Sequence, residues 1–237
     1  MRPAAKLPPV MPAATPALSP AALARCVPFV VFMALLALRG YLPDSLGVDA
    51  RWIYGVQTVI VAGLLAWYWR DYGELVRQNL PDARDTGWAV VVGIAVFALW
   101  VQLDAPWMQL GTATASFVPL DADGRLIWPL VLLRLAGAAL VVPVMEELFW
   151  RSFLMRWVQH PGFERVDPQT VGVKAIVVST FVFTLAHTLW LAAVVAGLAY
   201  ALLYRHTGKL WSAVIAHAVT NGLLGVWVLA TRRWEFW

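Results

Sequence analysis

Charged residues and cysteine are both scarce in this chain of 237 residues. Asp, Glu, Lys and Arg together make up 14% of it, whereas an ordinary soluble domain holds about 25%. The single cysteine, Cys26, excludes an internal disulfide and a cysteine-based metal cluster. Hydrophobic residues make up 61% of the chain, and its mean hydropathy is +0.69. These proportions exclude an ordinary soluble fold and indicate a polytopic membrane protein.

Seven apolar segments are candidates for membrane-spanning helices. They lie at 26–42, 52–69, 88–103, 127–158, 171–188, 189–204 and 209–229. The fourth is too long for one simple span, and we expect Pro129 and Pro143 to bend it. The segment 105–120 is half apolar and fits either an interfacial segment or an eighth span. The sequence therefore predicts an all-α transmembrane helical bundle with 7–8 spans.

The distribution of basic residues predicts how the bundle is oriented. With seven spans and a cytoplasmic N-terminus, twelve Lys and Arg residues fall in cytoplasmic segments and five in external ones. This excess follows the positive-inside rule. It also accounts for the net charge of +4 without a nucleic-acid partner. The Ala, Trp and Arg content favours a bacterial inner membrane.

The chain divides into four regions. Residues 1–25 hold six prolines and are expected to form a flexible N-terminal tail. Residues 26–125 are expected to hold the N-terminal transmembrane helices, and 126–230 a core that carries the polar motifs described next. The last segment, 231–237, reads Thr-Arg-Arg-Trp-Glu-Phe-Trp and predicts an interfacial C-terminal tail.

Two adjacent glutamates, Glu146 and Glu147, lie inside the fourth apolar segment. A charged group at membrane depth costs about 3 kcal/mol or more, so two of them require partners or a function. On a helix Glu147 and Arg151 are four residues apart with the acid first, which favours an ion pair. Glu146 then points about 100° away and is free to face a cavity. Alternatively, both glutamates join helices through Arg151 and Arg134, and Arg134 could equally line a substrate path.

Two further polar pairs lie on later segments. Phe183 and His187 are four residues apart near the end of the fifth segment, and His217 and Asn221 are four apart in the last one. Either pair alone fits interhelical hydrogen bonding. Together with the glutamates they supply carboxylates, two imidazoles and a carboxamide, which can activate water, move a proton and stabilise an oxyanion. These groups are sufficient for peptide-bond hydrolysis without a serine or cysteine nucleophile.

The three motifs, Glu-Glu-x-x-x-Arg, Phe-x-x-x-His and His-x-x-x-Asn, occur in this order over about residues 140–225. They resemble the CAAX-processing and bacteriocin-immunity (CPBP, or Abi) family of glutamate intramembrane proteases. The run Pro-Phe-Val-Val-Phe-Met-Ala-Leu-Leu-Ala-Leu-Arg and the C-terminal Trp-Glu-Phe-Trp are similar to its exosortase-associated, CAAX prenyl protease-related bacterial branch. The resemblance implies an all-helical core of about eight spans around an intramembrane catalytic cavity.

The resemblance also implies a role for each motif residue. Glu146 would be the general base that activates water, with His187 helping to hold or deprotonate it, while His217 and Asn221 would bind the oxyanion. Which of the two adjacent glutamates is the base stays open. The supporting residues would be Glu147, Arg151 and Phe183. No cofactor or metal is implied, and the substrate would be a membrane-anchored or lipid-modified protein, with an exosortase-type sorting system as a candidate link.

Three other functions fit the same residues. A metal-dependent membrane protease could use the glutamate and histidine side chains as ligands, although their spacing matches no zinc motif. A non-catalytic immunity or scaffold protein would need neither both histidines nor Asn221. A proton-coupled transporter is disfavoured because the chain shows no internal repeat. The complete motif set therefore favours an intramembrane endopeptidase.

Overall fold

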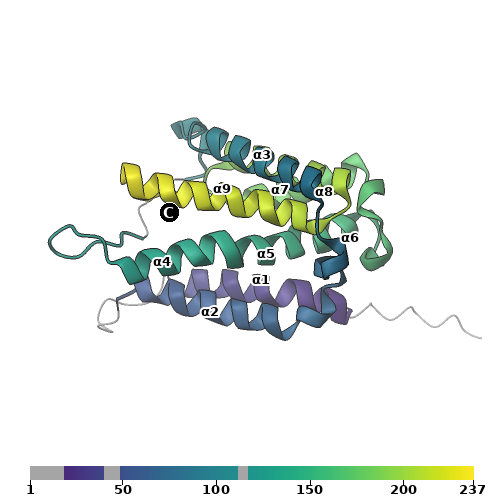
Figure 1. The fold of residues 1–237 in the computed structure, drawn as a ribbon, viewed down its shortest axis with the longest axis horizontal. Helices are drawn as coiled ribbons and strands as arrows, with labels where there is room; N and C mark the ends of the chain where they lie inside the picture. Colours follow the sequence, from purple (N-terminus) through teal and green to yellow (C-terminus); the bar gives the residue numbers. More distant parts are fainter. Residues whose placement is uncertain (1–18, 40–48, 112–116) are drawn as a thin grey trace, which may run out of the picture.

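The computed structural model describes residues 19–39, 49–111 and 117–237. Long helices lie side by side and run back and forth along the long axis of the molecule (Figure 1). Helical elements appear within each of the seven predicted segments, so the predicted all-α bundle is confirmed. In chain order they are α1 (Pro20–Arg39), α2 (Arg51–Trp67), α3 (Ala83–Trp100), α4 (Trp128–Ala136), η6 (Gly137–Val141), α5 (Val142–Glu147), η7 (Leu148–Met155), α6 (Arg156–Gln159), α7 (Val173–Leu185), α8 (Trp190–Thr207) and α9 (Leu210–Thr231).

Four of these helical stretches are long and apolar enough to cross a membrane. They are Pro20–Leu38, Ala83–Trp100, Trp128–Gln159 and Leu210–Thr231. The shorter α7 is also apolar, with 13 residues, fewer than the about 20 that a simple span needs. The described residues of the segment 105–120 form one 3₁₀ turn, η5 (Pro106–Met108), and no helix long enough for an eighth span.

The first helix begins at Pro20, before the predicted start at residue 26. A proline is tolerated in the first turn because its missing N–H has no intrahelical partner there. The Ser19 hydroxyl accepts a hydrogen bond from the Ala22 amide at 3.2 Å and caps this end. The predicted tail of residues 1–25 is therefore wrong at its C-terminal boundary, and its first 18 residues lie outside the described part of the chain.

The fourth segment is one helical run, and neither proline interrupts it. Pro129 lies in the first turn of α4, where a proline is tolerated because the amide there has no intrahelical partner. Pro143 follows the π-helical segment η6, in which the Val142 amide bonds to the carbonyl of Gly137, five residues back. In the same register the Ala138 carbonyl faces Pro143, which has no N–H to offer. At Pro143 the helix widens locally into this π-helical segment, which leaves the carbonyl available to a side chain.

Neighbouring helices pack as α1 with α2, α3 with α9, and α7 with α8. The approach of α3 to α9 is close because Gly93 has no side chain. A Cβ atom at this position would lie 2.5 Å from the carbonyl oxygen of Ala216. Small residues at such crossings let helix backbones approach one another, as is common between helices in membranes.

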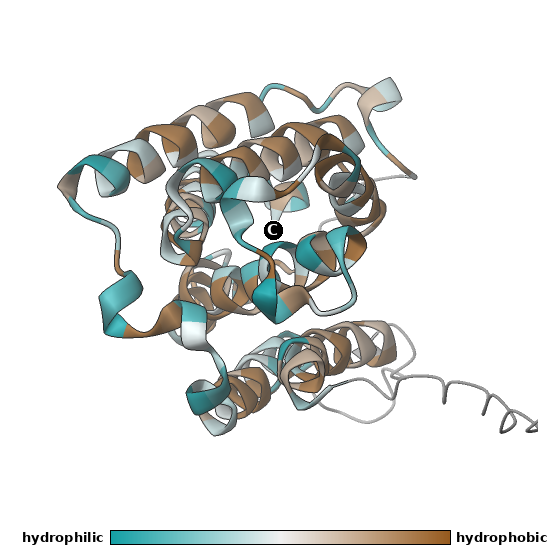
Figure 2. Cartoon of the chain, turned by 90° about the vertical axis from the view of Figure 1, so that its right-hand side faces the viewer, coloured by the Kyte–Doolittle hydropathy of each residue, from teal (hydrophilic) through white to brown (hydrophobic). Residues whose placement is uncertain are grey.

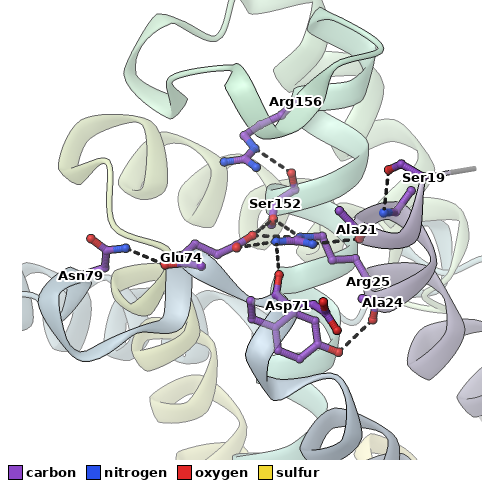
Figure 3. Close-up of polar contacts among 12 residues, drawn as sticks. Ser19, Ala21, Ala24, Arg25, Asp71, Glu74, Asn79, Ser152 and Arg156 are labelled. Carbon is purple, nitrogen blue, oxygen red and sulfur yellow. Dashed lines mark hydrogen bonds and ion pairs between the residues drawn. The ribbon is translucent and has the colours of Figure 1, made fainter.

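At one end of the bundle, a buried arginine side chain forms hydrogen bonds with several segments of the chain. Figure 2 views this end, where hydrophilic residues gather on the turns while the helices are largely hydrophobic. The Arg25 side chain is 3% exposed, pairs with Glu74 and donates to the Ser152 hydroxyl at 2.9 Å. The Ser152 hydroxyl also bonds to Glu74, and Arg156 donates to the Ser152 carbonyl (Figure 3). This network joins α1, the segment between α2 and α3, and η7.

Candidate active site

A cavity of about 250 Å³ opens between the helices, and all four residues predicted to act on a substrate line it. These residues are Glu146, His187, His217 and Asn221. They come from α5, from the turn after α7 and from α9, so segments far apart in the sequence meet here. Most of the remaining wall is aromatic or aliphatic. Polar groups therefore converge in a cavity whose other walls are mostly apolar.

The two adjacent glutamates differ in their surroundings. Glu147 is fully buried, with Oε2 at 3.2 Å from Arg151 Nε and Oε1 at 2.9 Å from His217 Nδ1. The predicted ion pair between Glu147 and Arg151 is thus confirmed. Glu146 lines the cavity, and its buried Oε2 has no hydrogen-bond partner among the described residues. One carboxylate is held by partners while its neighbour faces the cavity, because consecutive helical residues project about 100° apart.

Arg151 is held behind the cavity wall. Its side chain is 2% exposed, and Nη2 donates to the Gly197 carbonyl at 3.3 Å. The guanidinium carbon lies 4.7 Å from the centroid of the Phe183 ring and 5.4 Å from that of Tyr200. Contacts of this kind with two aromatic faces stabilise a desolvated cation. Phe183, predicted as a packing residue of the cavity wall, lines the cavity and also covers Arg151.

The hydrogen bonds of the two histidines fix which ring nitrogen is protonated. His217 Nδ1 lies 2.9 Å from the Glu147 carboxylate, and His187 Nδ1 lies 2.8 Å from the Phe183 carbonyl. Both partners are acceptors, so each Nδ1 carries the hydrogen. The second nitrogen, Nε2, of each ring is left for other partners. In the neutral ring this atom is an acceptor, and in the protonated ring it is a second donor.

His187 lies in the turn between α7 and α8, beyond the end of α7 at Leu185. Its ring meets Trp100 of α3 edge-on at 5.8 Å between centroids. The segment after α3 covers this turn, because the Leu110 amide bonds to the Thr188 carbonyl at 2.7 Å. Because α7 ends at Leu185, His187 lies in the turn that follows and reaches the cavity from there.

Asn221 is positioned by the π-helical segment. Its Nδ2 donates to the Ala138 carbonyl at 2.9 Å, the same carbonyl that Pro143 deprives of a backbone donor. An unpaired carbonyl in an apolar interior is costly, so this bond stabilises both elements. The carboxamide nitrogen carries a second hydrogen that this bond does not use.

Sequence reasoning missed the support beneath His217. Tyr200 stacks on the His217 ring, with 5.0 Å between centroids, and its hydroxyl donates to the Thr220 hydroxyl at 2.8 Å. Thr220 in turn donates to the Gly93 carbonyl at 2.9 Å. The available signal was a tyrosine well inside an apolar span, where its hydroxyl needs a partner. The part played by Gly93 depends on tertiary packing and had no signal of its own.

The far end of the cavity holds an arginine and the last residues of the chain. The Arg134 guanidinium carbon lies 4.3 Å from the Tyr54 ring centroid and 5.6 Å from that of Phe117. Among the described residues Arg134 forms no ion pair with either glutamate, so it lines the cavity instead. Phe236 and Trp237 line the cavity as well, and Trp237 is 7% exposed. The segment 231–237 therefore packs against the bundle, and its interfacial position stays a prediction.

Within the described part of the chain, no group of three or more His, Cys, Asp or Glu side chains is arranged to hold a metal ion. The apolar helices indicate an integral membrane protein, and the cavity is a site between these helices where polar groups meet.

Comparison with known proteins finds a similarity for the region that holds this site. Residues 127–223 match the family model described as Rce1-like, type II CAAX prenyl endopeptidase. The predicted resemblance to the CPBP family is therefore confirmed for the region that holds all three motifs, and it indicates a membrane protease of this type. No curated protein and no solved structure matches the chain. The comparisons give no support to the exosortase-associated branch, which stays a prediction.

Proposed function

We propose that this protein is an intramembrane glutamate-type endopeptidase that activates water to cleave a peptide bond in a membrane-anchored or lipid-modified protein. One observation carries the proposal: Glu146, His187, His217 and Asn221 line a single cavity, and Glu146 alone among the two adjacent glutamates faces it. These residues lie in the region that matches the membrane-protease family model.

In this mechanism Glu146 is the general base. A water molecule between its carboxylate and His187 Nε2 gives a proton to Glu146, while its oxygen attacks the peptide carbonyl carbon. The carbonyl electron pair moves onto oxygen and forms a tetrahedral oxyanion. The protonated Glu146 then passes its proton to the leaving nitrogen as the C–N bond breaks. The products are a carboxyl group and an amine, and Glu146 returns to its starting form.

His217 and Asn221 stabilise the oxyanion. The second Nδ2 hydrogen of Asn221 is one donor, because the first is engaged by Ala138. His217 donates from Nε2 when the ring is protonated at both nitrogens, with the Glu147 carboxylate as its counter-ion. Arg151 holds the Glu147 carboxylate in place through their ion pair. Two donors fixed in advance in an apolar cavity stabilise developing charge more strongly than water does.

We place the protein in a bacterial inner membrane, with the end at which α1 begins facing the cytoplasm. The excess of basic residues in the segments assigned to that side supports this orientation.

The test compares protein termini in cells that contain wild type, Glu146→Gln or Glu164→Gln protein at equal abundance. Glu164 is an exposed glutamate outside the cavity and gives the matched control. We expect membrane or exported termini that appear with wild type and Glu164→Gln but are absent with Glu146→Gln. Identical terminal profiles for all three folded proteins would exclude Glu146 as the base and favour the non-catalytic alternative.

A further inference from the structure

Among the described residues that line the cavity, three buried polar atoms lack a hydrogen-bond partner. They are Glu146 Oε2, Arg134 Nε and the Tyr54 hydroxyl oxygen. The proposed mechanism uses the first of these and leaves the other two unexplained. A buried donor without a partner costs about 1–3 kcal/mol, and more when it is charged. A ligand that pairs with these groups would recover that cost.

Arg134 is a half-buried cation in the wall of the cavity. No Asp or Glu side chain lies in an ion pair with it in the described part of the chain, whereas the buried arginines Arg25, Arg151 and Arg156 each have a hydrogen-bond partner. Its guanidinium is held against the faces of Tyr54 and Phe117. Both rings are almost fully buried, with 2% and 1% exposure. The planar group is therefore fixed in orientation before any ligand arrives, which lowers the entropy cost of binding an anion.

Simple extension of the side chain into the membrane interface would not give this arrangement. An arginine that extends to the interface places its charged head in water, whereas here Nε is buried and the guanidinium lies near the Tyr54 and Phe117 rings on the cavity wall. A counter-ion for the glutamates would lie in contact with one of them, and Glu147 is instead paired with Arg151.

We propose that Arg134 is a specificity-determining residue that binds a carboxylate of the substrate in the cavity. The inference rests on the proposed peptidase function. A carboxylate fits because guanidinium and carboxylate form two parallel charge-assisted hydrogen bonds. It also gives the half-buried guanidinium, whose Nε lacks a partner, an anion at an otherwise aromatic end of the cavity. Tyr54, which also carries an unpaired hydroxyl, forms the wall beside it.

The position of Arg134 sets the approximate length of peptide between the two ends of the site. Arg134 precedes Glu146 by twelve positions on one helical run, which corresponds to about 18 Å of helix. An extended peptide covers about 3.4 Å per residue. The bound carboxylate is thus about five residues from the attacked carbonyl. Both the chain terminus and an acidic side chain of a peptide supply this group.

The test uses a palmitoyl-anchored library of apolar decapeptides, incorporated in vesicles with the full-length protein. The library is made with a C-terminal carboxylate, with a C-terminal carboxamide, and as the carboxamide with one internal glutamate. Binding is measured by affinity selection and mass spectrometry on Glu146→Gln protein, and cleavage is measured separately on protein with Glu146 intact. Each is repeated with Arg134→Gln, Arg134→Lys and Arg125→Gln. Arg125 is highly exposed and outside the cavity, so it controls for loss of one positive charge.

We expect one of the two carboxylate forms to bind about tenfold to hundredfold more tightly than the plain carboxamide. Arg134→Gln should remove this preference without weakening carboxamide binding, Arg134→Lys should keep part of it, and Arg125→Gln should keep all of it. Which form is preferred distinguishes a chain terminus from a side chain.

Equal retention of all forms, no retention of any, or a preference that survives in folded Arg134→Gln protein would overturn the proposal. Arg134-dependent binding without cleavage would leave this inference standing and refute the peptidase function. Cleavage without an Arg134-dependent preference would refute this inference and leave the peptidase function standing.

Discussion

The two adjacent glutamates should respond to the same substitution in opposite ways. Glu147→Gln removes the negative charge from a fully buried site where Oε2 pairs with Arg151 at 3.2 Å and Oε1 bonds to His217 at 2.9 Å. Arg151 is then left 2% exposed without its anion. Breaking a buried ion pair by removing one partner costs about 3–5 kcal/mol. A loss of this size lowers the folded-to-unfolded ratio by a factor of about 100 or more.

Glu146→Gln should leave stability almost unchanged and abolish cleavage. The Glu146 Oε2 atom has no partner to lose, so we expect a change in unfolding free energy of about 1 kcal/mol or less. The assay is reversible unfolding of the purified protein in mixed micelles, followed by tryptophan fluorescence and helicity. Activity is measured on the same samples by the release of new termini from a reconstituted substrate.

A double variant separates the ion pair from general damage to the helix. Replacing both partners of a buried ion pair with apolar or neutral groups is often tolerated far better than replacing one. Glu147→Gln combined with Arg151→Met should therefore recover much of the stability that Glu147→Gln loses. The reasoning is refuted if Glu147→Gln is as stable as wild type, or if Glu146→Gln is the more destabilised of the two.

Three further outcomes follow from the structure. Gly93→Ala would place its Cβ 2.5 Å from the Ala216 carbonyl and should cost about 1–3 kcal/mol in unfolding free energy, whereas Gly63→Ala, with nothing within 4 Å, should not destabilise. For Glu74, burial raises the pKa but the hydrogen bonds and charge of Arg25 outweigh it, so the folded pKa lies below the ordinary 4.5. Its contribution is therefore present above about pH 4.5 and lost as pH falls through the folded pKa, and unfolding measured from about pH 6 to 3 should show a shallower acid decline in Glu74→Gln. Dialysis against EDTA and 1,10-phenanthroline should leave cleavage unchanged, and a loss of activity that zinc restores would instead support the metal-dependent alternative.

The features that the sequence could predict are those governed by local helical geometry. The pair Glu147 and Arg151 is four residues apart, so a helix of any tertiary context brings the side chains together. The seven apolar segments likewise follow from composition alone. Composition could not predict where the first helix begins or where the C-terminal segment packs. Helix α1 begins at Pro20, and Trp237 packs against the cavity. Both depend on packing between segments distant in the chain.

The residues that hold the site in place could not be predicted from the sequence for the same reason. Tyr200 holds His217 only because α8 and α9 are adjacent, and Thr220 reaches the Gly93 carbonyl only because α3 crosses α9 closely. A single sequence contains no information on these crossings until the helices are placed. The sequence shows Arg134 as an arginine in an apolar span. Whether it pairs with the glutamates or lines the cavity follows only from the position of its guanidinium in the structure.

Pro143 links the local distortion of the helix to the chemistry of the site. In water, a helix relieves a missing N–H by exposing the carbonyl to solvent, but an apolar interior offers no such partner. Here the π-helical segment directs the Ala138 carbonyl to Asn221, and the bond holds the carboxamide at the cavity. The same six-residue helix α5 that follows this distortion carries both glutamates. A proline that would otherwise weaken a membrane helix thus gives the Asn221 carboxamide a fixed position relative to Glu146, because both are anchored to one helical run.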